Sequence, residues 1–186
     1  MHVSILVVLY GKGLEQSLTL KSLSENIISF ADLYIVNNGP EKITENDLFR
    51  SKLESSYASV RVVEHLDNRP LSMLYNDFIG YYPDSDYYVL LDDDSELSSE
   101  YIGLLKNPKA DLIIPRIINK NDGVCYYPID NGSVVKCDTS LSFLKVMSIG
   151  SGLFISNHLI TEMKKKNLVI FSMSDLLCMV LTHHFS

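Results

Sequence analysis

Four short apolar runs recur through the first half of the chain, and each is followed by glycine or polar residues. Buried strands have this character, and the runs lie at residues 3–10, 33–36, 60–64 and 87–91. The segments between them show the apolar spacing of helices, at residues 14–30, within residues 41–55 and after Pro70. Because strands that alternate with helices form βαβ units, the pattern predicts an α/β fold with a mostly parallel, twisted sheet.

The second half of the chain has shorter and less regular segments. The elements expected there are a helix at 99–105, a strand at 112–115, a hairpin around Asn131-Gly132, a strand-like run at 146–156 and a helix at 157–166 capped by Asn157. No repeat, low-complexity segment or linker divides the 186 residues. We therefore expect one domain, with a nucleotide-binding half at residues 1–97 and a second-substrate half at residues 98–186.

Charge and cysteine usage exclude several classes of protein. The net charge of −7, without a basic stripe, argues against a nucleic-acid partner. Cys125, Cys137 and Cys178 show no C-x-x-C spacing, which is typical of reduced thiols and gives no support for a zinc site.

No segment is long enough for a transmembrane helix, and residues 3–10 lack the features of a signal peptide. A cytoplasmic location is expected. The basic residues 164–166 indicate a solvated helix end, with a membrane-surface contact as the alternative.

Three carboxylates, Asp92, Asp93 and Asp94, follow the fourth apolar run directly. If side chains alternate at the end of the strand, Asp92 and Asp94 point one way and Asp93 the other. Two carboxylates on one side repel each other unless a cation lies between them, and hard divalent cations prefer oxygen ligands. The alternative is a solvated acidic turn that leads into the next helix, with a serine at 95, 98 or 99 as its N-cap.

Polar residues also follow the other three strands of the first half. They are Gly11 after the first strand, Asn37 and Asn38 after the second, and Asn68 and Arg69 after the third. In open α/β sheets, ligands bind beyond the carboxyl ends of the strands, where the strand order reverses. We therefore expect the acidic run to lie in the ligand-binding crevice, which favours a functional role. The sequence contains neither a P-loop nor a dinucleotide-binding glycine motif.

Five segments, in order along the chain, resemble motifs of the family 2 glycosyltransferases, and in particular their bacterial rhamnosyltransferase-like branch. The segments lie at residues 7–10, 35–40, 68–79, 91–95 and 151–156. Leu91-Asp92-Asp93-Asp94-Ser95 is similar to the L-D-Q-D-S of that branch, and Ser151 to Ser156 is similar to its S-G-x-L-I-S. The resemblance implies a GT-A fold, which is Rossmann-like. An aspartate-nucleophile phosphatase is a weaker alternative, because its D-x-D would be expected on the first strand.

The resemblance implies transfer of a sugar from a nucleoside-diphosphate sugar, such as a UDP- or dTDP-sugar, to a glycan or lipid-linked acceptor. The reaction would serve bacterial surface polysaccharide synthesis and would invert the anomeric centre. Mn²⁺ or Mg²⁺ would bind Asp94, with Asp92 on the metal or the ribose and Asp93 facing away or touching the nucleotide. The remaining residues that the resemblance places at the nucleotide are Tyr10, Gly11, Asn37, Asn38 and Arg69.

The resemblance also implies a catalytic base, which would take the proton of the acceptor hydroxyl. Asp175 is the candidate for this role, and the alternative is that it is a helix residue at the edge of an apolar run. Asn37 stands where the family has an aspartate, and Pro70 replaces a glycine, so the nucleotide base is not specified. The chain is also short at its carboxyl end relative to the family. A relative that binds nucleotide sugars without catalysis is therefore the alternative function, and a place at the inner face of the membrane would suit a lipid-linked acceptor.

Overall fold

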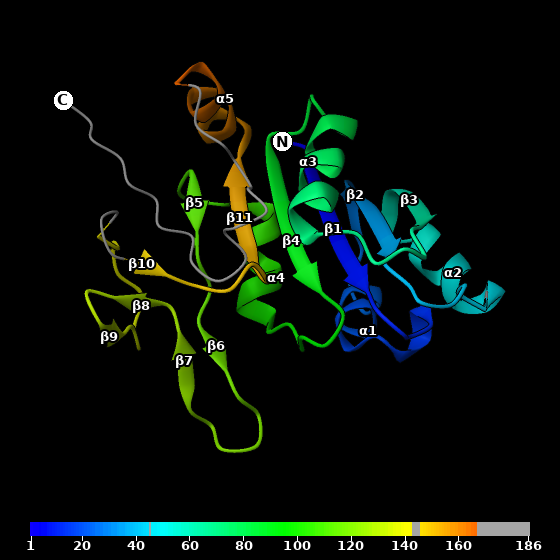
Figure 1. Cartoon of the computed structure of the whole chain (residues 1–186), viewed down its shortest axis with the longest axis horizontal. Helices are drawn as coiled ribbons and strands as arrows, with labels where there is room; N and C mark the ends of the chain where they lie inside the picture. The colour runs from blue at the N-terminus through cyan, green and yellow to red at the C-terminus, as the bar shows by residue number, and fades with distance from the viewer. Residues whose placement is uncertain (45, 143–145, 167–186) are drawn as a thin grey trace.

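A six-stranded sheet with the order β3-β2-β1-β4-β11-β5 forms the centre of the molecule. The computed structural model describes residues 1–44, 46–142 and 146–166 (Figure 1). The strands of this sheet are β1 (Val3–Leu9), β2 (Ile28–Asn37), β3 (Tyr57–Glu64), β4 (Tyr87–Asp92), β5 (Leu112–Ile113) and β11 (Leu153–Ser156). Strands β3, β2, β1 and β4 pair in parallel, whereas β11 runs antiparallel to both β4 and β5. The predicted α/β fold with a mostly parallel sheet is confirmed.

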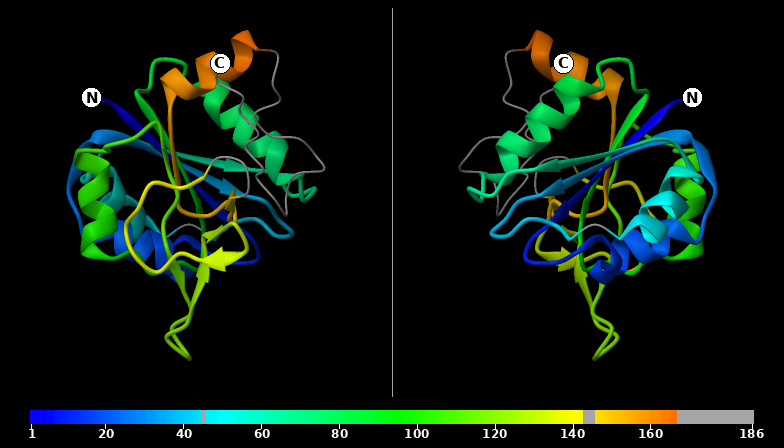
Figure 2. Two further views of the ribbon diagram at one scale, coloured as in Figure 1. Left: turned by 90° about the vertical axis from the view of Figure 1, so that its left-hand side faces the viewer. Right: turned by 90° about the vertical axis from the view of Figure 1, so that its right-hand side faces the viewer.

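Helices cover both faces of this sheet (Figure 2). They are α1 (Leu18–Ser24), α2 (Asp47–Glu54), α3 (Leu71–Tyr81), α4 (Ser99–Lys106) and α5 (Asn157–Lys165), with a short 3₁₀ helix, η1 (Leu14–Gln16), before α1. Alternate residues of β1 face opposite layers, as the pleat of a strand requires. Ile5 and Val7 pack in the cluster that contains α1, α2 and α4, whereas Leu6 and Val8 pack in the cluster that contains α3 and α5.

The second half of the chain adds two small sheets outside the main one. Their strands are β6 (Ile117–Ile118), β7 (Cys125–Tyr127), β8 (Ile129–Asp130), β9 (Ser133–Val134) and β10 (Val146–Met147). The hairpin predicted around Asn131-Gly132 is confirmed, since both residues have positive φ and join the antiparallel strands β8 and β9. The hairpin of β6 and β7 extends away from the main body (Figure 1).

The helix predicted at residues 14–30 was wrong in its extent. Ser17 interrupts it, because the Ser17 side chain accepts a hydrogen bond from the Leu20 N–H at 3.1 Å and so begins α1. The helix ends at Ser24, and Ile28 already pairs with Tyr57 in the sheet. Strand pairing therefore determines the conformation of residues that helical spacing had assigned to α1.

Two further predictions in the second half were wrong. The strand-like run at 146–156 is divided into β10 and β11 by the segment Gly150-Ser151-Gly152, in which Gly152 has a φ of +87°. The cap of α5 is Ser156 and not Asn157, because the Ser156 side chain accepts from the Leu159 N–H. Among the described residues, no helix combines the length and the apolar character needed to cross a membrane.

Candidate functional site

The carboxyl ends of β1 and β4 lie next to each other at the point where the strand order reverses. From β1 the chain passes through α1 to β2 on one side, and it returns through β3 and α3 to β4 on the other side. Such a switch point is where open α/β sheets bind ligands. The residues that follow these two strands are therefore neighbours, so Tyr10 and Gly11 lie beside the acidic run.

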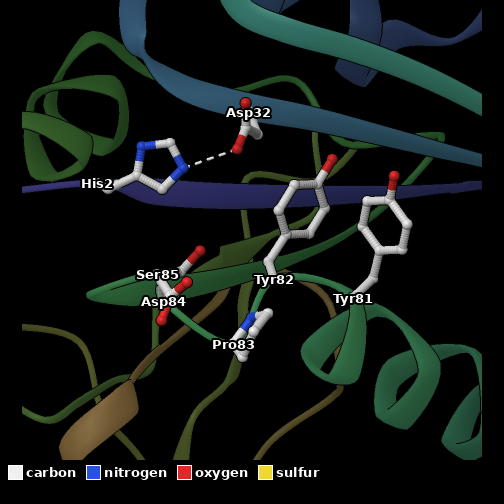
Figure 3. Close-up of a pocket in the computed structure, with 7 residues that line it drawn as sticks. All are labelled: His2, Asp32, Tyr81, Tyr82, Pro83, Asp84 and Ser85. Carbon is white, nitrogen blue, oxygen red and sulfur yellow. Dashed lines mark hydrogen bonds and ion pairs between the residues drawn. The ribbon is translucent and has the colours of Figure 1, made fainter.

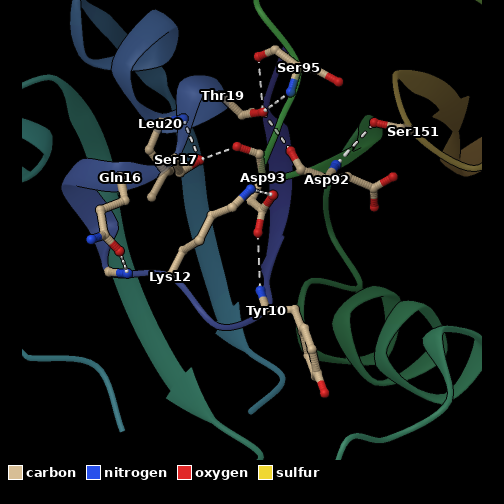
Figure 4. Close-up of polar contacts among 11 residues, drawn as sticks. Tyr10, Lys12, Gln16, Ser17, Thr19, Leu20, Asp92, Asp93, Ser95 and Ser151 are labelled. Atoms are coloured by element: carbon tan, nitrogen blue, oxygen red, sulfur yellow. Dashed lines mark hydrogen bonds and ion pairs between the residues drawn. The ribbon is translucent and has the colours of Figure 1, made fainter. Parts of the chain in front are cut away.

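Asp93 fastens the two strand ends together. Its side chain is largely buried. Its carboxylate accepts a hydrogen bond from the Tyr10 N–H at 3.1 Å and forms an ion pair with the Lys12 ammonium at 2.5 Å (Figure 4). Both carboxylate oxygens are thus bonded within the protein. The Asp93 side chain faces away from that of Asp92 (Figure 4).

Lys12 was missed by the sequence analysis. A single lysine between Gly11 and Gly13 carries no recognisable pattern, and its partner Asp93 lies 81 residues further along the chain. Only the pairing of β1 with β4 brings the two side chains together. The ammonium leaves Asp93 with little net charge to offer a ligand, so the effective negative charge of the acidic run comes from Asp92 and Asp94.

The Asp92 carboxyl group is held in surroundings that disfavour its charge. Its pKa is raised to about 6, mainly by burial and further by the charges of Asp94 and Asp93, while a hydrogen bond with the Ser151 hydroxyl opposes the rise. Strand β4 ends at Asp92, so Asp93 and Asp94 lie in a turn and the predicted strand alternation does not extend to them. Asp94 is exposed, yet its charge still acts on Asp92. A cation near these two carboxylates would relieve their repulsion.

Asn37 and Asn38 shape the loops after β2 and β3. The Asn37 side chain is buried, donates to the Glu41 carbonyl oxygen at 2.7 Å and accepts from the Gly39 N–H at 3.1 Å. The Asn38 amide donates to the Arg69 carbonyl oxygen and accepts from the Arg69 N–H, both at 2.9 Å. These side-chain groups are bonded within the protein, so the structure supports a positioning role for both asparagines.

Two other predicted nucleotide-binding side chains are accessible at the same edge of the sheet. The Tyr10 side chain is 53% exposed, and its ring points away from Asp93 (Figure 4). The Arg69 guanidinium is partly exposed and lies 3.4 Å from Asp67 and 3.9 Å from Asp77.

The backbone of Gly11, another predicted nucleotide-binding residue, contacts the next loop. Gly11 has a φ of +63°, and its N–H donates to the Gly39 carbonyl oxygen at 2.8 Å. The loops after β1 and β2 are therefore joined.

The loop before β11 brings the second half of the chain to the acidic run. Ser151 is buried, and its hydroxyl accepts a hydrogen bond from the Asp92 N–H at 3.0 Å. Gly152 donates to the Leu90 carbonyl oxygen at 2.6 Å, and the Tyr101 hydroxyl donates to the Gly152 carbonyl oxygen at 3.1 Å. The resemblance had included Ser151 in a motif without giving it a role. The structure places it against the predicted metal ligand.

Tyr75 of α3 completes the wall behind Asp92. It is buried, and burial followed by the Asp92 charge raises the pKa of its phenol. A β-carbon at Gly150 would lie 3.1 Å from the Tyr75 hydroxyl oxygen, so glycine leaves room for the ring. Nothing in the local sequence indicated that Tyr75 would lie beside Asp92.

The donor set at the acidic run suits a hard cation that keeps other oxygen ligands. Among residues 1–44, 46–142 and 146–166, no three acidic, histidine or cysteine side chains form a metal-binding group. Mg²⁺ is commonly held by one or two carboxylates together with substrate phosphates. Asp92 and Asp94 can supply such a pair, and their mutual repulsion contributes to the raised pKa of Asp92.

The predicted catalytic base, Asp175, lies outside the described residues. The same is true of Cys178, whereas Cys125 and Cys137 are free thiols.

A hollow of about 220 Å³ lies at the opposite edge of the sheet (Figure 3). Its lining includes His2 and Asp32, whose side chains bond to each other at 2.7 Å, and Asp32 also accepts from the Ser59 hydroxyl at 2.6 Å. These polar groups already have partners. The hollow also lies by the amino ends of the parallel strands, which is not where such sheets bind their ligands.

Comparison of the chain with models of known protein families found no match, and comparison with curated protein sequences found no significant match.

Proposed function

We propose that this protein is a family 2-like glycosyltransferase of the GT-A fold that uses a nucleoside-diphosphate sugar as donor. The observation that carries the proposal is the partly buried Asp92, whose charge is disfavoured, beside Asp94 at the switch point of the sheet. The exposed Tyr10 ring follows β1, and the partly exposed Arg69 guanidinium lies in the loop after β3, at the same edge of the sheet. The reaction, sugar transfer from this donor, is inferred from the five motifs that resemble those of the family in the same order.

The proposed donor places its diphosphate at the acidic run and its nucleoside towards the ends of β1 and β2. Bound Mn²⁺ or Mg²⁺ would stabilise the negative charge that develops on the diphosphate as the glycosidic bond breaks. Asp94 and Asp92 hold the cation in this arrangement, while Asp93 keeps the β1 loop fixed through Tyr10 and Lys12. Asn37 and Asn38 position the loops on which the nucleoside would lie.

The acceptor is proposed to bind on the side formed by residues 98–186. Asp175 would act as the base that takes the proton of the acceptor hydroxyl, and the transfer would invert the anomeric centre. A glycan or lipid-linked acceptor of bacterial surface polysaccharide suits the family that the motifs resemble. A cytoplasmic location, at the inner face of the membrane for a lipid-linked acceptor, goes with this function.

The test is a thermal-shift screen of UDP, dTDP and their sugars, with Mn²⁺ and with EDTA. A ligand that binds only the folded state raises the melting temperature. We expect a Mn²⁺-dependent rise for at least one nucleotide, and its loss in Asp94→Ala. Asp84→Ala, an exposed aspartate at the opposite edge of the sheet, serves as the matched control. Nucleotide binding that is the same in Asp94→Ala as in the wild type would place the cation elsewhere.

A variant of Asp175 distinguishes an enzyme that transfers the sugar from a protein that only binds the donor. For the nucleotide that binds, donor hydrolysis and sugar transfer are measured in the wild type and in Asp175→Asn. A catalytic base predicts that turnover is lost while the thermal shift is kept. Wild-type protein that binds nucleotide but neither hydrolyses nor transfers from any common donor would instead be a nucleotide-sugar-binding relative without catalysis.

A further inference from the structure

The acidic run is fastened to the start of α1 by hydroxyl groups. The Thr19 hydroxyl oxygen lies 2.5 Å from the Asp92 carbonyl oxygen, and it accepts a hydrogen bond from the Ser95 N–H at 3.0 Å (Figure 4). It also lies 3.0 Å from the Ser95 carbonyl oxygen. One side chain therefore holds both ends of the four-residue segment 92–95. A hydroxyl can do so because it donates one bond and accepts others.

A second hydroxyl of the same helix end holds the middle of the segment. The Ser17 side chain donates to the Asp93 carbonyl oxygen at 2.9 Å while it caps α1 by accepting from the Leu20 N–H. The Thr19 N–H points to the same Asp93 oxygen at 3.4 Å. Ser17 and Thr19 are fully buried, so water cannot substitute for these bonds. The backbone that carries the acidic side chains is thus set by α1.

We propose that Thr19 is a positioning residue for the divalent cation at Asp92 and Asp94. This inference rests on the proposed function of the acidic run. The Thr19 hydroxyl bonds to backbone atoms of Asp92 and Ser95, and so it holds the two ends of the segment that contains both ligand residues. Small divalent cations such as Mg²⁺ require near-ideal coordination geometry. A shift of the backbone between two ligand residues therefore weakens the binding of the cation. Groups that hold metal ligands in place typically change affinity by about 10- to 100-fold when they are removed.

A purely structural role for Thr19 makes a different prediction, and a matched hydroxyl separates the two. Ser4 is also fully buried, and its hydroxyl bonds to the Ser85 hydroxyl at 2.5 Å near the opposite edge of the sheet. Ser4→Ala therefore removes a buried hydroxyl without touching the acidic run. Thr19→Val removes the hydroxyl and keeps the shape of the side chain, whereas Thr19→Ser keeps the hydroxyl.

The experiment titrates Mn²⁺ alone into the full chain, follows free Mn²⁺ by electron paramagnetic resonance, and measures melting temperatures in EDTA. Thr19→Val should weaken Mn²⁺ binding by about 10- to 100-fold, while Thr19→Ser stays within a few-fold of the wild type. Ser4→Ala should lower the melting temperature and leave the Mn²⁺ affinity unchanged. If Thr19→Val does not fold, Ser17→Ala takes its place and should also weaken Mn²⁺ binding.

Two outcomes overturn the inference, and they have different meanings. Unchanged Mn²⁺ affinity in Thr19→Val, with a lowered melting temperature, would leave Thr19 a structural residue and the proposed function intact. Wild-type protein that binds no Mn²⁺ would overturn the cation site itself, and with it the role of Thr19.

Discussion

Asp92 combines partial burial with two acidic neighbours, an arrangement that costs the folded state free energy at neutral pH. Its pKa of about 6 lies above the ordinary value of 3.8, so folding favours the protonated form. The destabilisation is complete at a pH above about 6 and disappears at a pH below the ordinary value, because there both states are protonated. A cation bound at Asp92 would offset this unfavourable charge and would therefore stabilise the folded protein.

Replacing Asp92 with asparagine should therefore stabilise the metal-free protein. A difference of about two pKa units corresponds to about 3 kcal/mol, which is the upper limit for the gain in Asp92→Asn at pH 7.5. At pH 5 the gain should fall to roughly half of that. Urea unfolding in EDTA at the two pH values measures it, with the exposed Asp84→Asn as the control. An Asp92→Asn gain that does not depend on pH would show that charge is not the cause.

The sequence could predict which residues carry charge at the site, but it could not predict their partners. The acidic run and its position at a strand end were recognisable from Asp92 to Asp94. That Asp93 would pair with Lys12, and that Asn37 and Asn38 would bond within the loops, depends on contacts between separate strand ends. Side-chain partners are fixed by tertiary packing, and packing is not encoded in local spacing.

At the scale of elements, the loop that joins β10 to β11 depends on Gly152. Its φ of +87° is strained for other residues, and a β-carbon there would lie 2.5 Å from the Pro115 side chain. Gly152→Ala should therefore destabilise the fold by about 2 kcal/mol or more, and it should disturb Ser151 and so weaken Mn²⁺ binding. Denaturant unfolding and the Mn²⁺ titration measure the two effects.

Gly103 in α4 provides the matched glycine control. A β-carbon there meets no atom within 4 Å, and helices prefer alanine to glycine. Gly103→Ala should stabilise the protein by about 0.5–1 kcal/mol without changing Mn²⁺ binding. Equal stability changes in the two variants would show that Gly152 is not conformationally required.

Element types were more predictable than element ends. Long apolar runs such as β1 and β4 were recognised because a buried strand needs continuous apolar residues. The start of β2 was mistaken for helix, because residues 28–30 also fit helical spacing and only pairing with β3 decides their conformation. The hairpin at Asn131-Gly132 was predicted because its turn requires positive φ, which is a local property.

For the whole molecule, the alternation of strands and helices indicated the class of fold but not the order of the strands. In the order β3-β2-β1-β4 the chain leaves β1 on one side and returns on the other, and this order places four polar strand ends side by side. The antiparallel β11 then brings Ser151 to Asp92. A strand pairing between residues about sixty positions apart has no signal in a single sequence.

The last prediction concerns where ligand binding is felt across the molecule. UDP with Mn²⁺ at about 100 times its Kd should stabilise the fold by about 2.7 kcal/mol, if it is the nucleotide that binds. In hydrogen exchange, protection should rise at the N–H groups of Tyr10, Asp92 and Ser95, because each donates to a side chain that holds the acidic run in place. The N–H of Asp86, which bonds to the His2 carbonyl oxygen at the opposite edge, serves as the reference and should not change beyond the global stabilisation. Protection confined to the edge that contains His2 and Asp32 would move the ligand to the hollow of Figure 3 and away from the acidic run.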